Sequence, residues 1–287
     1  MTITIFEDKN CKGKSRIVSG NIADLKGQTA DKPSSIQMTS DSDEVLLFKN
    51  DDWHGGVLYL RGKKTVSDLG DKDEGGRNGF GNAIRSVRVT PFQLDLNVTV
   101  VKDAGGDLPG SWKNQTEAEA AINDIVAKAN AFYVDKQSLL KLSVARIRFR
   151  TSANLFAISK LESAILPRDW IEKGEVDTIF VDRFTKEGAI GRAKFPCWGQ
   201  GVIVAAKVNA TSGPDTFQDN DDMAETLVHE LGHYLGLSHN TSNDMAANIM
   251  FPSSNGSGLA AKNLRPDQIE EMQQKLARNI TRRGDRN

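Results

Sequence analysis

Short runs of apolar or alternating residues dominate the N-terminal third of the chain. They occur at 2–6, 15–18, 45–48, 57–60 and 87–90, with Gly, Asn and Asp between them. Runs of this length that are separated by turn-forming residues are typical of short antiparallel strands. The pattern therefore predicts an all-β domain, which we place at residues 1–92.

The pattern changes beyond Pro91, which stops the last of these strands, and residues 91–95 are expected to join two domains. A β-branched run at 96–101 predicts a strand, and the capping box TEAE at 116–119 predicts the start of a helix. The helix is indicated by a stripe of apolar residues at helical spacing: Ile122, Ile125, Val126, Ala129, Phe132 and Tyr133. Further strand patterns follow at 140–149, 176–181 and 201–209. This order of elements predicts an α/β domain at 93–287, with a sheet backed by helices.

Composition and charge narrow the class of protein. The chain has 287 residues, of which 38% are hydrophobic and 26% charged, and its net charge is −1. This balance is typical of a soluble globular protein and does not favour binding to nucleic acid or to anionic membranes. No apolar run approaches the roughly 20 residues of a membrane span, and the first residues lack the pattern of an export signal. The two cysteines, Cys11 and Cys197, exclude a disulfide framework; we expect free thiols, with a single bridge as the alternative.

A zinc-hydrolase motif lies at residues 221–239, which read DDMAETLVHELGHYLGLSH and contain the pattern H-E-x-x-H-x-x-G-x-x-H. On a helix, His229 and His233 share one face and can bind a single metal ion. Gly236 can adopt a positive φ and end the helix, so that the chain turns back and His239 supplies the third ligand. The spacing therefore predicts a three-histidine zinc site.

Three neutral imidazoles leave the fourth position of a tetrahedral zinc open for water, which is the arrangement of a catalytic site. Glu230 is placed to accept a proton from that water. Asp221 or Asp222 is expected to cap the helix, and Pro266 is expected to open a final helix. Three of the four histidines lie in the motif, and the fourth, His54, is expected at the surface. A metal-free pseudoenzyme is the alternative to a working zinc site.

Together with Met250 in the segment NIMFP, the long motif makes residues 96–287 resemble a metzincin zinc metalloendopeptidase. The resemblance implies one catalytic zinc, a protein or peptide substrate, and a Met-turn at Met250 beneath the metal. It also implies that the strand at 201–209 edges the substrate cleft and pairs with the substrate backbone, and that 251–258 lines the specificity pocket. Metzincins mostly act outside the cell, which favours extracellular action although no export signal is recognised. The subfamily stays open.

An internal repeat in the first domain has the form F-x4-[C/W]-x-G and appears at 6–13 and 48–55. A second element follows in each copy, at 31–35 and 82–86. Together with the strand patterns around them, these paired features make residues 1–92 resemble a βγ-crystallin domain. The resemblance implies two Greek-key motifs that pack as a β-sandwich, so the whole chain is expected to be a multidomain protein.

In βγ-crystallins the second element of each motif binds calcium through side-chain and main-chain oxygens. Here Asp31, Ser34 and Asn82 match that pattern and imply one weak calcium site. Arg85 stands where the family has a hydroxyl, and its positive charge opposes calcium. The alternative is that Asp31 and Asn82 only cap turns through hydrogen bonds to the backbone.

Two functions from different classes compete. The first is a zinc endopeptidase with Glu230 as the general base, and the second is a non-enzymatic crystallin-type binding protein with a degenerate protease domain. Hydrolysis of a non-peptide amide by the same centre is a third reading. The crystallin-like fold is also used by a secreted bacterial inhibitor of metalloproteases, which suggests intramolecular inhibition, with residues 71–81 in the cleft.

Overall fold

The computed structural model describes residues 3–53, 55–71, 76, 79–136, 138–158, 176–185, 190–193, 201–208, 216–241, 247–252 and 258–284. The chain divides into two units. The first consists of Met1–Phe92, Gln137–Leu139 and Gln273–Asn287, and the second of Gln93–Lys136 and Leu140–Met272. None of the helices in the described parts is both long enough and apolar enough to cross a membrane.

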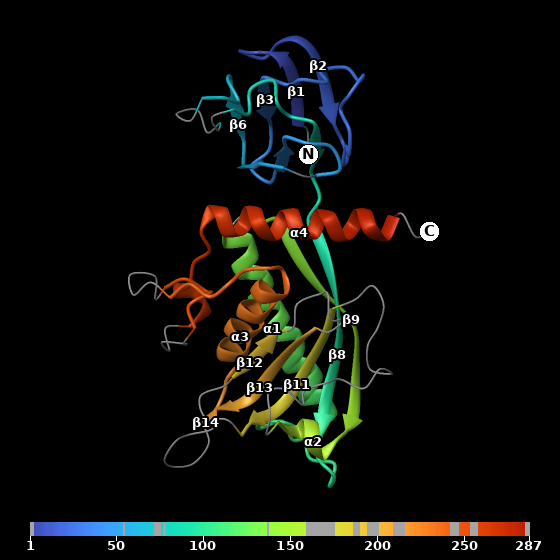
Figure 1. Ribbon diagram of the computed structural model, residues 1–287, viewed down its shortest axis with the longest axis vertical. Coiled ribbons are helices and arrows are strands. Elements are labelled where there is room, and N and C mark those ends of the chain that lie inside the picture. The colour runs from blue at the N-terminus through green and yellow to red at the C-terminus, as the bar shows by residue number, and fades with distance from the viewer. Residues whose placement is uncertain are drawn as a thin grey trace. The chain divides into compact units, whose positions relative to one another are not determined.

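Short antiparallel strands form two sheets in the first unit (Figure 1). The four-stranded sheet has the order β2-β1-β3-β6 and contains β1 (Ile3–Asp8), β2 (Lys12–Val18), β3 (Ser35–Met38) and β6 (Lys64–Val66). The three-stranded sheet has the order β5-β4-β7 and contains β4 (Glu44–Phe48), β5 (Val57–Arg61) and β7 (Ser86–Arg88). Apolar side chains from both sheets share one buried core. The strand positions predicted from the alternating pattern are therefore confirmed.

Each copy of the internal repeat contributes backbone pairing to the sheet of the other copy. Strand β6 belongs to the second copy but pairs with β3 of the first, with Val66 opposite Ile36. In return, Ile22 of the first copy forms an antiparallel bridge with Val87 in β7. The two copies therefore interlock rather than stand side by side.

Two serine hydroxyls hold equivalent turns in the two copies. Each hydroxyl accepts a hydrogen bond from a backbone N–H at the [C/W] position and donates one to a carbonyl three residues earlier. In the first copy, the Ser35 hydroxyl accepts from the N–H of Cys11 at 3.0 Å and donates to the Asp8 carbonyl at 2.5 Å. In the second copy, the Ser86 hydroxyl accepts from the N–H of Trp53 at 3.0 Å and donates to the Asn50 carbonyl at 2.6 Å. The sequence repeat therefore corresponds to a repeated set of hydrogen bonds. The thiol of Cys11 is free, whereas Cys197 and His54 lie outside the described residues.

The second unit is built on a mixed sheet with the order β12-β13-β11-β8-β9 along its main path. Its strands are β8 (Phe92–Lys102), β9 (Leu140–Thr151), β10 (Ala157–Ile158), β11 (Val176–Phe184), β12 (Gly191–Ala193), β13 (Val202–Val208) and β14 (Thr216–Phe217). Strands β8, β11 and β13 run parallel, with Phe180 opposite Val100 on one side and Val204 on the other. Strands β10 and β14 pair with β11 and β13 respectively.

Helices α1 (Gln115–Asp135) and α3 (Asn220–Tyr234) pack against each other and against this sheet, α1 on β9 and α3 on β12 and β13 (Figure 1). The predicted apolar stripe of α1 is buried, as expected from its spacing. The shorter helices are α2 (Ala153–Phe156) and the 3₁₀ helix η5 (Leu259–Ala261). The final helix, α4 (Pro266–Gly284), begins at the predicted proline. The predicted combination of sheet and helices is therefore present.

Two local predictions are wrong. The strand predicted to start at residue 96 already begins at Phe92, whose N–H donates to the Leu139 carbonyl at 2.8 Å, so β8 includes most of residues 91–95, within which the boundary between the two units falls. The N-cap of α1 is Asn114 rather than the threonine at 116: its Oδ1 accepts from the N–H of Glu117 at 2.9 Å. The carboxylate of Glu117 in turn accepts from the N–H of Lys113 at 3.0 Å. An asparagine cap with a glutamate three residues later satisfies the free N–H groups of the first turn as well as the predicted box would.

Candidate metal centre

Helix α3 carries two of the motif histidines on one face, because His229 and His233 lie four residues apart. Apolar residues on its other faces are buried and hold the helix in the unit: Met223, Ala224, Leu227, Val228 and Leu231. The N-cap is Asp219, whose Oδ1 accepts from the N–H groups of Asp221 and Asp222, both at 2.9 Å. The prediction that Asp221 or Asp222 is the cap is therefore wrong. Both carboxylates still lie in the first turn, where the helix dipole favours negative charge.

Gly236 ends the helix in a left-handed conformation, with a φ of 102°. Its N–H donates to the His233 carbonyl, and the N–H of Leu237 donates to the Gly232 carbonyl, both at 2.9 Å. This pair of bonds is the Schellman arrangement, in which a residue with positive φ follows the last helical turn. The chain reverses there and brings His239 back toward the face that carries His229 and His233.

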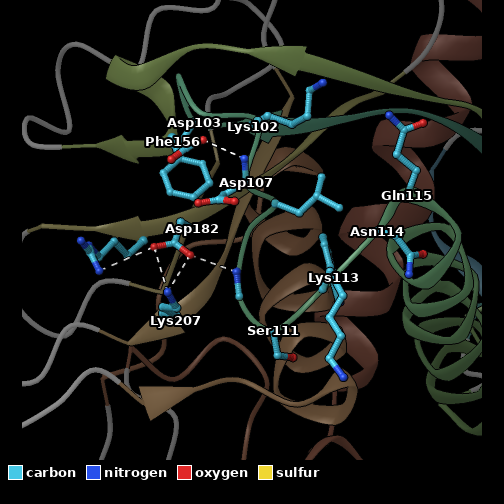
Figure 2. A pocket seen from close by; sticks show the side chains of 15 residues that line it. Lys102, Asp103, Asp107, Ser111, Lys113, Asn114, Gln115, Phe156, Asp182 and Lys207 are labelled. Atoms are coloured by element: carbon cyan, nitrogen blue, oxygen red, sulfur yellow. Dashed lines mark hydrogen bonds and ion pairs between the residues drawn. The ribbon is translucent and has the colours of Figure 1, made fainter.

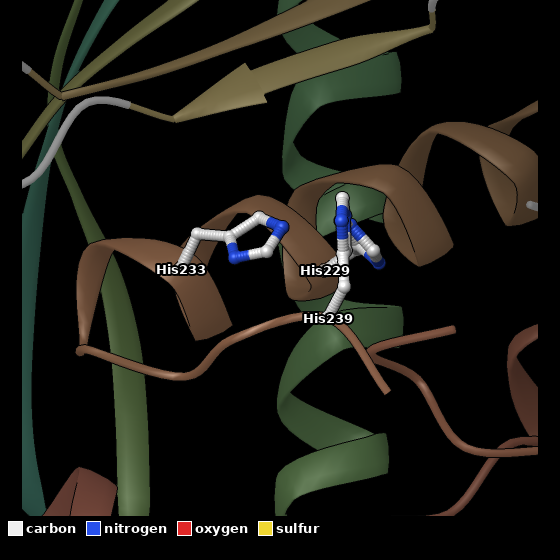
Figure 3. Close-up of side chains that lie close together, drawn as sticks. All are labelled: His229, His233 and His239. Atoms are coloured by element: carbon white, nitrogen blue, oxygen red, sulfur yellow. The ribbon is translucent and has the colours of Figure 1, made fainter. Parts of the chain in front are cut away.

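The three histidine side chains converge on one point, as Figure 3 shows. One ligand atom from each of His229, His233 and His239 can be chosen so that all lie within 4.8 Å of one another. The Nε2 atoms of His229 and His239 are 3.2 Å apart. The distances between the three ring centroids are 4.7, 5.2 and 4.5 Å. This spacing suits three imidazoles around a single ion.

Backbone carbonyls select the tautomer of two of these rings. Nδ1 of His229 donates to the Ile249 carbonyl at 2.6 Å, and Nδ1 of His233 donates to the Leu237 carbonyl at 2.8 Å. A carbonyl can only accept, so each Nδ1 carries the proton and each Nε2 presents its lone pair. Burial lowers the pKa of His229 to about 4 and also lowers the pKa of His233. Both rings are therefore neutral near pH 7, which is the form that binds a metal.

The metal-free protein is expected to lose stability as the pH falls from 7 to 5. His229 has a pKa of about 4 in the folded state and 6.5 as its ordinary value. Between these values the unfolded chain binds a proton that the folded chain does not, so the free energy of unfolding decreases with falling pH. For His229 alone the loss is about 2 kcal/mol at pH 5. The lowered pKa of His233 acts in the same direction.

Urea unfolding of the metal-free protein at pH 7 and pH 5 measures this loss. His229→Gln is the matched variant, because glutamine cannot take up the proton and should show a smaller pH dependence. An identical pH dependence in the variant and the parent protein would contradict the assignment.

Glu230 is only 6% exposed, and its side chain packs against the backbone of β12. A Cβ atom at Gly191 would lie 2.6 Å from Oε1 of Glu230 and 2.6 Å from Cγ2 of Thr226. Any side chain at position 191 would therefore displace the glutamate. The sequence pattern did not indicate this contact, because nothing in the residues around 191 suggests a close approach to the helix.

The prediction that the strand at 201–209 edges the cleft is wrong. Strand β13 is flanked by β11 on one side and by β12 on the other, with Gly191 opposite Val204 and Ala193 opposite Val202. Within the described residues, β12 is the last strand at the end of the sheet that α3 contacts. Residues Val202–Ala206 are buried without alternation, which is typical of an interior strand. That apolar run was the signal that could have corrected the prediction.

Met250 is fully buried beside the motif helix. A Cβ atom at Gly232 would lie 2.4 Å from the sulfur of Met250, so the methionine packs directly on the helix between the two histidines.

A buried ion pair lies one helical turn before His229 in α3, where Glu225 contacts Lys262 at 3.2 Å. The charge of Lys262 contributes to the lowered pKa of His229 after the larger effect of burial. This ion pair was not indicated by the sequence pattern.

Of the candidate calcium residues in the first unit, Ser34 and Asn82 come together and Asp31 bonds locally. The hydroxyl of Ser34 donates to Oδ1 of Asn82 at 2.6 Å, and Oδ2 of Asp31 accepts from the N–H of Gly27 at 3.4 Å. The local bond of Asp31 agrees with the alternative that it caps a turn. Calcium binding at these residues stays a prediction.

Two predicted segments fall partly outside the described residues. These are the proposed inhibitory loop at 71–81, of which 72–75, 77 and 78 are not described, and the predicted pocket wall at 251–258, of which 253–257 are not described.

A pocket of about 640 Å³ lies at the carboxyl ends of β8, β11 and β13 (Figure 2). Its floor contains Asp182, which is 2% exposed, accepts from the N–H of Gly110 at 2.9 Å and pairs with Lys207 at 3.0 Å. No residue of the histidine motif lines this pocket. The charged floor is a satisfied ion pair, so we assign it a structural role.

Residues 119–240 match the family model of the reprolysin-like metallo-peptidase family M12B. This stretch begins within α1 and ends one residue after His239, so it contains the whole histidine motif. A search of curated proteins finds no match to the chain.

Several solved structures are similar to parts of the chain. Mirolysin is 14% identical with a TM-score of 0.46, over 67% of this chain and 96% of that one. A βγ-crystallin from Ciona intestinalis is 21% identical with a TM-score of 0.25, over 31% of this chain and 100% of that one. The N-terminal domain of protein S is 21% identical with a TM-score of 0.26, over 31% and 94%. The resemblances predicted from the sequence, to a metallopeptidase and to βγ-crystallin domains, are thus both found among these matches.

Proposed function

We propose that the second unit, whose residues 119–240 match a metallopeptidase family, is a zinc-dependent endopeptidase. The observation that carries the proposal is the convergence of His229, His233 and His239, with the buried Glu230 directly after His229 in the chain. The donor set fits zinc, because Nε2 of His229 and Nε2 of His239 lie 3.2 Å apart, close to the separation of about 3.3 Å between two nitrogen ligands of one tetrahedral zinc ion.

Zinc bound there would lower the pKa of a coordinated water and polarise the scissile carbonyl. Glu230 accepts the proton of the attacking water as the general base and later returns it to the leaving amine. Its burial between α3 and the backbone of β12 supports this role, because a carboxylate held in one orientation is aligned for proton transfer. The carbonyls of Ile249 and Leu237 keep His229 and His233 in the tautomer that binds metal.

The substrate backbone is proposed to pair with β12 rather than with β13. Strand β12 is the outermost described strand on the α3 side, and its Gly191 touches Glu230. An extended peptide that is added to such an edge gains main-chain hydrogen bonds and passes the catalytic carboxylate. Residues 251–258 remain the proposed wall of the specificity pocket.

A diverse peptide library tests the proposal. The zinc-loaded protein is incubated with the library with and without a chelator, and the cut sites are read by mass spectrometry. Cuts that disappear with chelator and return when zinc is restored support an endopeptidase. Zinc-loaded protein that cuts nothing would favour the non-enzymatic crystallin-type binding protein, and turnover of non-peptide amides alone would favour the third reading.

Intramolecular inhibition by the first unit stays a proposal of its own. Replacing residues 71–81 with a glycine-serine segment of equal length should accelerate cleavage of a small peptide if these residues block the cleft. Equal rates would leave the crystallin-like unit as a recognition module.

A further inference from the structure

The turn that contains Met250 touches two of the three histidine positions through its backbone. The Ile249 carbonyl accepts from Nδ1 of His229 at 2.6 Å, and the Met250 carbonyl accepts from the N–H of Asn240 at 2.8 Å. Asn240 directly follows His239, which lies beyond the helix. A shift of this turn would therefore rotate one imidazole and move the chain segment that carries another.

The turn is held by a pair of buried side-chain amides. Asn248, which is 1% exposed, donates from Nδ2 to Oε1 of Gln268 at 2.8 Å, and Nε2 of Gln268 donates back to Oδ1 of Asn248 at 3.2 Å. The same Oδ1 accepts from the N–H of Met250 at 3.0 Å. Gln268 is 5% exposed and lies in the first turn of α4, where its Oε1 also accepts from the N–H of Arg265 at 3.0 Å. Each amide thus fixes the orientation of the other.

We infer that Gln268 is a positioning residue for the metal centre, which acts by locking Asn248 and through it the turn that orients His229 and His239. The inference rests on the proposed zinc site. The two hydrogen bonds between Gln268 and Asn248 join Gln268 to the turn, so its influence on the histidines passes through Asn248. Without Gln268, the Nδ2 of Asn248 would keep only its longer hydrogen bond to Oδ1 of Asn263 at 3.3 Å, and the side chain would be held less firmly in the orientation that binds the Met250 N–H.

The turn has a second attachment, which should keep it folded when Gln268 is changed. The N–H of Ile249 donates to the Asn263 carbonyl at 2.9 Å, and the N–H of Asn263 donates to the Ala247 carbonyl at 2.8 Å. Loss of the amide pair is therefore expected to loosen the turn rather than unfold it. Groups that orient metal ligands typically change metal affinity about 10- to 100-fold when they are removed.

The test compares two glutamines of the same helix by their effect on zinc affinity. Gln268→Met keeps the length of the side chain and removes the amide. Gln273→Met is the matched control, because Gln273 is 1% exposed and its amide donates to the Ser138 carbonyl at 2.7 Å, away from the turn. The zinc dissociation constant is measured by competition with a chromogenic chelator, and the fold of each metal-free variant is checked by circular dichroism.

We expect Gln268→Met to weaken zinc binding about 10-fold or more, and Gln273→Met to leave it within about twofold of the parent protein. Gln268→Glu, which keeps the acceptor and loses the donor to Asn248, serves as a second variant if the methionine variant does not fold, and should also weaken binding. The double variant Gln268→Met with Asn248→Ala should bind zinc no more weakly than the weaker-binding of the two single variants, because both changes disrupt the same pair of hydrogen bonds.

Unchanged zinc affinity in both Gln268 variants would overturn the inference, and so would additive effects in the double variant. Equal weakening by Gln273→Met would also overturn it, because the effect would then be one of general stability. A parent protein that binds no zinc would instead overturn the proposed function, so the two failures are distinguishable.

Discussion

Replacing Glu230 with glutamine is expected to reduce peptidase activity on the order of 10²- to 10⁴-fold while zinc binding is kept. Glutamine has nearly the same shape and size as glutamate, but its amide cannot accept the proton of the attacking water. The side chain is 6% exposed and packs against Gly191, so the variant should hold the same position. None of the three histidines is altered, and metal content should remain stoichiometric.

The measurement is kcat/KM on a peptide from the library, together with zinc content after dialysis. Glu119→Gln makes the same chemical change at an exposed position of α1 and should leave both values unaltered. Near-normal turnover of the Glu230 variant would show that another group acts as the base. Loss of zinc in this variant would show that the carboxylate supports the metal site itself.

His239→Ala is expected to weaken zinc binding on the order of 10²-fold, although His239 lies beyond the helix. Zinc sites contribute roughly 10–16 kcal/mol of binding free energy, so one of four ligands is worth about 3 kcal/mol when the rest are unchanged. The helix end at Gly236 and the bond between Asn240 and Met250 do not involve the imidazole of His239. The loss should therefore come from the missing ligand rather than from a changed fold.

Zinc competition with a chelator measures this effect, and His54→Ala, which removes the histidine outside the motif, is the control. An unchanged zinc affinity in the His239 variant would rule out the three-histidine site. The variant should also be less active at limiting zinc and recover partly when zinc is in excess.

Periodicity explains why much of this fold could be predicted from the sequence. The stripe on α1 follows from the 3.6-residue turn of the helix, and the convergence of His229 and His233 follows from the same geometry. Strands β1, β2, β4, β5 and β7 were indicated by alternation and by the turn residues between the runs, whereas the short β3 and β6 were not predicted. Gly236 was identifiable because few other residues adopt a positive φ at a helix end.

Features that depend on contacts between distant residues could not be predicted in the same way. The amide pair joins Asn248 to Gln268, 20 residues apart, and no local pattern marks two amides as partners. Strand β12 contains only Gly191–Ala193 and is too short to show alternation, so it was not predicted, and the edge was placed at the strand at 201–209 by the family resemblance. The caps Asn114 and Asp219 were missed because nearby threonine and aspartates offered equally good candidates.

The interlocking of the two crystallin-like copies makes them a single folding unit. Neither copy can complete its own hydrogen bonding: Val66 must reach Ile36, and Oδ1 of Asn21 accepts from the N–H of Val89, 68 residues away in sequence. Closing contacts over such distances costs chain entropy before any sheet is stabilised, so we expect this unit to fold slowly and without a stable intermediate in which only one copy is folded. During synthesis, the first copy is therefore expected to stay unfolded until the second copy has left the ribosome.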